Sequence, residues 1–126
     1  MALNEQSIQP AYVLGRLFAV LEKVQQEAIG DMNASIKDRY FTSACASPKS
    51  VFPILLRLSQ HHISKAAFGY ASENRIEKIM NLLDIEKNPF PSHLTLDEQG
   101  IFILGYYHQR TAFYVKNGAT AETETN

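Results

Sequence analysis

The side chains best suited to metal binding or nucleophilic catalysis are the four histidines and the single cysteine of this 126-residue chain. His61 and His62 are adjacent, and neighbouring side chains on a helix point about 100° apart, so these two cannot hold one ion together. Further ligands would have to come from His93 and His108. Because no HExxH, paired Glu-x-x-His or CxxC spacing occurs, a metal-dependent helical enzyme is the weakest functional hypothesis.

The thiol of Cys45 lies in the run SACAS, whose small residues are typical of close helix packing. No sequence context of a cysteine enzyme surrounds it, so we expect an inert thiol. With one cysteine the chain cannot form an intramolecular disulfide, which fits a reducing compartment. The six glycines are scattered and form no phosphate-binding loop. The sequence therefore predicts neither a catalytic residue nor a cofactor.

The stretch FILGYYHQR, residues 102–110, ends in three polar residues that follow an apolar run: His108, Gln109 and Arg110. Apolar residues of this segment occupy almost every direction around a helix axis, so we expect the helix to be buried on most sides. The polar residues should then be partly buried, with carboxylate or carbonyl partners and a structural role. Gly105 in mid-helix costs about 1 kcal/mol relative to alanine, which predicts a close backbone approach of another helix. The expected partner is the strip of small residues at Ala11, Gly15 and Ala19.

Basic residues are concentrated between positions 32 and 70, where five lysines and arginines oppose Asp38 alone, giving 5 − 1 = +4. The whole chain has a formal net charge of −1, which argues against coating of nucleic acid by bulk charge. Four of the side chains lie at helical spacing and form what we call the basic row: Lys49, Arg57, His61 and Lys65. With Lys37 and Arg39 this row is a candidate contact for DNA phosphates, although a merely solvated helix face is an equally good interpretation. Tyr40 could stack on a base, but its spacing favours the core.

Five helices and no strand are predicted to position these residues, because apolar residues recur at spacings of three and four and nowhere alternate convincingly. The helices are expected at residues 10–29, 34–46, 48–68, 72–86 and 96–116. Ser47 and Pro48 suit the start of the third helix, while Pro53 predicts a kink or a start delayed to about Ser50.

Capping residues predict the boundaries of the last two helices. Ser72 is a plausible N-cap, and Thr95 with Glu98 matches the capping box. Asn117 and Gly118 should end the last helix, and the segment ATAETETN after them has nothing sizeable to bury. The predicted fold class is all-α, a compact bundle of about five helices in one domain over residues 1–118, with a disordered tail at 119–126.

The overall composition, 45% hydrophobic and 20% charged, is ordinary for a soluble globular protein. No apolar run approaches the ~18 residues that a membrane span needs. The N-terminal stretch MALNEQSIQP lacks the features of a signal peptide. We therefore expect a cytoplasmic protein without a membrane partner.

Four stretches in combination carry a family resemblance: AYVLGRLFAVLEKVQ, SPKSVFPILL, HHISK and LGYYHQR. They resemble the C-terminal region of the large subunit of the type I-C CRISPR Cascade complex. In that family the same gene also yields, from an internal start, a separate small subunit equivalent to this helical region, and the chain is similar to it over nearly its whole length. The motif matched at 104–110 is carried over as a structural signature only.

The resemblance implies a non-enzymatic, cytoplasmic subunit of an RNA-guided surveillance complex, present in more than one copy. Such a subunit bridges the large subunit and the crRNA-bound backbone subunits, and it helps to hold the opened target DNA, in particular the displaced non-target strand. An alternative is a helical protein–protein interaction module without direct nucleic-acid contact. Salt-sensitive binding of single-stranded DNA would favour the first hypothesis, and partner binding alone the second.

Overall fold

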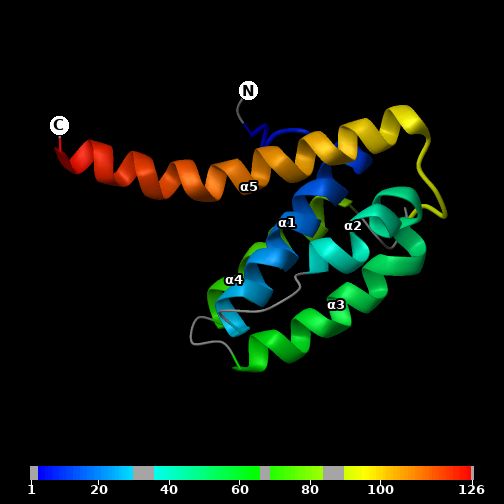
Figure 1. The fold of residues 1–126 in the computed structure, drawn as a ribbon, viewed down its shortest axis with the longest axis horizontal. Helices are drawn as coiled ribbons and strands as arrows, with labels where there is room; N and C mark the ends of the chain where they lie inside the picture. The colour runs from blue at the N-terminus through cyan, green and yellow to red at the C-terminus, as the bar shows by residue number, and fades with distance from the viewer. Residues whose placement is uncertain (1–2, 30–35, 66–68, 84–89, 126) are drawn as a thin grey trace.

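The computed structural model describes residues 3–29, 36–65, 69–83 and 90–125 (Figure 1). Within these ranges, side chains are described except at residues 28, 29, 62, 64, 65, 69, 70, 72 and 114–125. The helices are α1 (Pro10–Ile29), α2 (Ile36–Ala46), α3 (Pro48–Lys65), α4 (Gly69–Leu83) and α5 (Leu96–Thr125). No strand occurs in the described part of the chain, and the all-α prediction is confirmed.

The first helix forms the centre of the molecule. It begins at Pro10 and ends at Ile29, as predicted, and the side-chain oxygen of Gln9 accepts a hydrogen bond from the backbone N–H of Tyr12 at 3.2 Å. Every residue from 11 to 22 is buried, because α3, α4 and α5 all pack against this helix. An amphipathic helix would bury only one stripe, so α1 is a core helix enclosed on several sides.

Aromatic rings fill the space between α1, α2, α3 and α5. Phe18 lies at the centre of this cluster, with ring centroids 5.3 to 6.4 Å from four other rings in edge-to-face arrangements. The four rings are those of Phe41, Phe52, Phe102 and Tyr106. Edge-to-face pairs of this kind add about 0.5–1.5 kcal/mol each beyond the area they bury, so the cluster ties four helices together.

Two glycines allow α1 and α5 to cross at very short distance. A Cβ on Gly105 would lie 2.9 Å from the carbonyl carbon of Tyr12, and one on Gly15 would lie 2.9 Å from the carbonyl carbon of Phe102. Any side chain at either position would therefore collide with backbone. The close approach predicted from Gly105 is confirmed, with the partner backbone supplied by α1.

Several helix boundaries follow the sequence signals, and others do not. The capping box is confirmed by two bonds, Thr95 N–H to Glu98 Oε1 at 2.9 Å and Glu98 N–H to Thr95 Oγ1 at 3.1 Å. The start of α3 at Pro48 is confirmed, so the alternative of a delayed start is wrong, and Pro53 lies inside the helix on its exposed side. The N-cap predicted at Ser72 is wrong, because α4 already begins at Gly69.

The last helix differs from its prediction in length and in burial. It continues past Asn117 to Thr125, and Figure 1 shows this end projecting beyond the other helices. The predicted stop is therefore not observed, and disorder of residues 119–126 stays a prediction. Burial on most sides is wrong, because Ile103, Leu104 and Tyr107 are 38%, 45% and 41% exposed on one face of α5.

Candidate nucleic-acid interface

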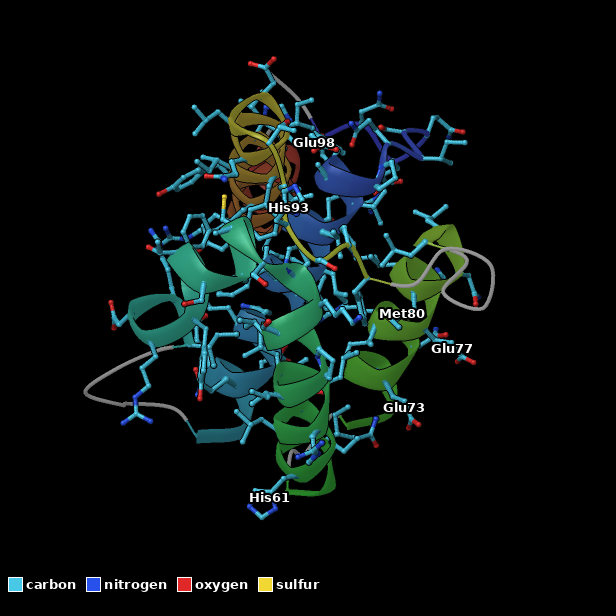
Figure 2. The ribbon with its side chains drawn as sticks, turned by 90° about the vertical axis from the view of Figure 1, so that its right-hand side faces the viewer. His61, Glu73, Glu77, Met80, His93 and Glu98 are labelled. Atoms are coloured by element: carbon cyan, nitrogen blue, oxygen red, sulfur yellow. The ribbon has the colours of Figure 1, made fainter. Side chains whose placement is uncertain are left out.

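The basic row lies on the outer side of α3. Lys49, Arg57 and His61 are all exposed, and Figure 2 shows His61 at the far end of the helix. The side chain of Lys65 lies outside the described residues. Since successive members are four or eight residues apart, they form a stripe that drifts around the helix by about 40° for every four residues. The exposed apolar residues Ile54 and Leu58 lie on the same helix.

The two cations predicted on α2 have different surroundings. Arg39 is exposed, whereas Lys37 is half-buried and donates a hydrogen bond from Nζ to the Tyr107 hydroxyl at 3.0 Å. The same ammonium group lies 5.0 to 5.7 Å from the centroids of three rings, those of Phe41, Tyr106 and Tyr107. Rings at this distance attract a cation through their quadrupole, so Lys37 already has protein partners. Tyr40, expected in the core, is half-buried and packs against the hydrophobic cluster.

The residues considered for metal or nucleophilic chemistry do not assemble. Among the described residues no group of three or more histidine, cysteine, aspartate or glutamate side chains could hold a metal ion. Figure 2 shows His61 at the lower tip of the molecule and His93 far from it in the upper half. Cys45 is buried, its Sγ lies 3.6 Å from the carbonyl oxygen of Gln99, and burial raises the pKa of its thiol. A protonated, enclosed thiol is a poor nucleophile.

Polar side chains of residues 106–109 on α5 form hydrogen bonds with side chains of α1, and one of these partners is a buried carboxylate. The Tyr106 hydroxyl donates to Glu22 Oε1 at 2.6 Å, and both side chains are buried. His108 Nδ1 lies 2.8 Å from the Tyr12 hydroxyl. Gln109 Oε1 accepts a hydrogen bond from Arg16 Nε at 2.9 Å. The predicted structural role fits these bonds.

Glu22 is a charged residue of α1, yet only 6% of it is exposed. Enclosure of α1 on several sides is the physical reason, because a helix so surrounded has no wide polar face. Burial raises the pKa of the Tyr106 hydroxyl, and its hydrogen bond to Glu22 raises it further.

A cleft of about 510 Å³ between the N-terminal segment, α1, α4 and α5 has no counterpart in the sequence predictions. Four of its lining side chains are cationic: Arg16, Lys23, Arg75 and Lys78. Glu5 is the acidic residue in the same lining. These cations come from two helices far apart in the sequence, α1 and α4, so no local spacing could have brought them together. The missed signal is the buried Arg16 on an otherwise apolar stretch of α1.

Comparison with known proteins places this architecture in a family. A family model described as CRISPR-associated protein (Cas_Csd1) matches residues 1–114. The match includes α1 to α4 and most of α5, and with them both the basic row and the cleft. A search of curated proteins finds no match. No helix of the described residues is long and apolar enough to cross a membrane.

Proposed function

Because the chain belongs to the Cas_Csd1 family of CRISPR-associated proteins, we propose that it is the small subunit of a type I-C Cascade complex. In this role it carries no catalytic activity and works in the cytoplasm. It bridges the large subunit and the crRNA-bound backbone subunits, with another copy of itself in the same complex. It also stabilises the opened target DNA, especially the displaced non-target strand, by contacts to phosphates that do not depend on base sequence.

The DNA-binding part of the proposal depends chiefly on one observation, the exposure of the basic row. Lys49 and Arg57 extend into solvent from one helix of a chain whose formal net charge is −1. Cations collected on one helix can follow a phosphate backbone even when the total charge is slightly negative, because salt screens charges farther away than about 10 Å. The basic row therefore supports a local contact with a DNA strand better than it supports attraction of DNA by the net charge of the whole chain.

A second candidate function is a protein–protein interaction module without DNA contact. The exposed apolar face of α5, formed by Ile103, Leu104 and Tyr107, favours it. Clustered apolar side chains on a surface are typical of protein interfaces. The two functions differ in one respect that can be measured, since only the first requires the charges of α3.

The test is target-DNA binding by the reconstituted effector complex in three forms: without this chain, with it, and with a variant carrying Lys49→Ala, Arg57→Ala and Lys65→Ala. A control variant carries Glu73→Ala and Glu77→Ala on the exposed side of α4 (Figure 2), which truncates helix-surface side chains without removing a cation. Assembly of each variant is checked by the subunit ratio of the purified complex.

We expect both omission of the chain and the triple change to weaken DNA binding, while the control variant binds as the wild type does. Each lost phosphate contact should reduce affinity several-fold at moderate salt, because counterions are no longer released at that position. Weakening by omission alone would favour the interaction module. No effect of either change would refute the proposed role.

A further inference from the structure

One of the cations that line the cleft is almost completely buried. Arg16 is 6% exposed, and its Nε donates to Gln109 Oε1 at 2.9 Å. Within the described part of the chain, the buried Nη1 of Arg16 has no hydrogen-bond partner. A buried N–H group without an acceptor is unfavourable, and more so when it is charged. The arginine that lines the cleft thus has a buried donor without an acceptor.

No carboxylate neutralises this guanidinium at contact distance in the described residues. Glu5 is the acidic residue of the cleft, and no ion pair links it to Arg16. Burial lowers the pKa of Arg16, and the negative charge of Glu5 only partly opposes this effect. Arginine nevertheless keeps its charge in proteins, so the cleft contains a buried positive charge that no carboxylate of the described residues fully neutralises.

Three further cations surround the opening. Arg75 donates to Glu27 at 3.1 Å, which occupies part of its hydrogen-bonding capacity. Lys23 Nζ and the Arg75 guanidinium lie 5.8 and 5.7 Å from the centroid of the Phe113 ring. Lys78 is exposed on α4. An anion that entered the cleft would meet donors from α1 and α4 at once.

The size and lining of the cleft restrict the anion. A volume of about 510 Å³ falls within the roughly 300–1,000 Å³ of small-molecule sites and exceeds the needs of an inorganic ion. Part of the wall is apolar and consists of Leu3, Val20, Ile79, Ala112 and Phe113. Arginine suits phosphate because its planar group presents several donors to the phosphate oxygens. A phosphate that carries an apolar or aromatic group fits both parts of the lining.

We propose that the cleft between α1, α4 and α5 binds a nucleotide unit, with the guanidinium of Arg16 directed to the phosphate and Lys78 and Lys23 at the opening. The nucleoside part lies against the apolar wall. The nucleotide is either a free mononucleotide or one unit of a nucleic-acid strand. The site uses no residue of the basic row and does not depend on the proposed role in Cascade.

The experiment is a calorimetric titration of the full chain with three ligands: inorganic phosphate, thymidine 5′-monophosphate and a twelve-residue oligothymidylate. The variants are Arg16→Gln, which removes the guanidinium, and Lys78→Ala, which removes an exposed charge and should leave the fold intact. Asn74→Ala is the matched control, an exposed side chain on α4 that does not line the cleft. Circular dichroism verifies that each variant is folded.

We expect thymidine monophosphate to bind more tightly than phosphate. Arg16→Gln should weaken its binding at least about tenfold, and Lys78→Ala about two- to fivefold, by loss of a buried and an exposed charged contact respectively. Asn74→Ala should bind the mononucleotide as the wild type does. Tighter binding of the oligonucleotide, also weakened by Lys78→Ala, would identify a strand as the natural source of the nucleotide.

The proposal is overturned if neither the mononucleotide nor the oligonucleotide binds the wild-type chain saturably. It is equally overturned if Lys78→Ala leaves both affinities unchanged, even where Arg16→Gln fails to fold. Failure here would leave the proposed function intact, because that function is tested through α3 variants in the assembled complex.

Discussion

At the scale of single residues, the hydrogen bond between Tyr106 and Glu22 should set the response of the fold to alkaline pH. Burial and this bond raise the pKa of Tyr106 above the ordinary value of about 10. Below pH ~10 the hydroxyl is protonated in both folded and unfolded chains, and its contribution to stability is fully present. Above that pH the unfolded chain loses the proton first, so the free energy of unfolding decreases as pH rises.

Tyr106→Phe should therefore have two effects. At neutral pH it should lower the free energy of unfolding by about 1.5–3 kcal/mol, because the buried Glu22 loses a donor. Above pH ~10 it should flatten the alkaline decline, which for one group is at most about 1.4 kcal/mol per pH unit. Urea unfolding at several pH values measures both. Tyr107→Phe is the control on the same helix and should decline as the wild type does; an equally steep decline in Tyr106→Phe would contradict this assignment.

Residue-level prediction agrees with the structure where packing is local and fails where contacts between distant helices decide burial. The small residues around Cys45 predicted its packing in a helix, whereas its inertness and a structural role for the motif at 102–110 stay predictions. The burial of Glu22 and Arg16 does not follow from neighbours along the chain, because it depends on α4 and α5 enclosing α1 from directions that the sequence of α1 does not encode. The α1 partners of His108 and Gln109 were missed for the same reason.

At the scale of elements, the crossing of α1 and α5 depends on two glycines. Gly105→Ala would place a methyl group against the Tyr12 backbone, which cannot rotate away as a side chain can. The helices would have to separate, and we expect a loss of more than about 3 kcal/mol in the free energy of unfolding. Thermal or urea unfolding measures it.

Gly100→Ala provides a control five residues earlier in the same helix. A Cβ at Gly100 meets nothing within 4 Å, so this change should only improve helix propensity, by about 1 kcal/mol. Opposite signs for the two substitutions would establish close packing rather than general helix flexibility as the reason for Gly105. Similar stabilisation in both would show that the crossing can relax.

The presence of each helix was easier to predict than the residues at which it begins and ends. Periodic apolar residues identified all five helices, and local capping chemistry fixed the starts of α1, α3 and α5. Gly69 and Tyr70 carry no recognised start signal, so the beginning of α4 was predicted three residues late. The exposed face of α5 could not be predicted either, because its apolar residues resemble those of a buried helix.

At the scale of the whole molecule, cations are divided between α3, the cleft and the aromatic contacts of Lys37. The sequence shows a positive segment but does not show which charges are already used by the protein. Lys37 has four partner groups, a hydroxyl and three rings, whereas Arg57 is exposed on α3. Contacts between helices that are distant in the sequence decide which of these cations already have partners within the protein.

The distinction predicts different salt dependences for two variants of the assembled complex. Replacing Arg57 and Lys65 by alanine should make the plot of log affinity for target DNA against log salt less steep, by about 0.7 per lost contact with a single strand. Lys37→Ala should leave the slope unchanged and instead lower the stability of the isolated chain by about 0.5–1 kcal/mol, since its ammonium stabilises the packing of α2 on α5. Binding isotherms at four or more salt concentrations, with unfolding curves for Lys37→Ala, measure both effects. Parallel slopes for the Arg57/Lys65 variant and the wild type would mean that the basic row is only a solvated face of α3.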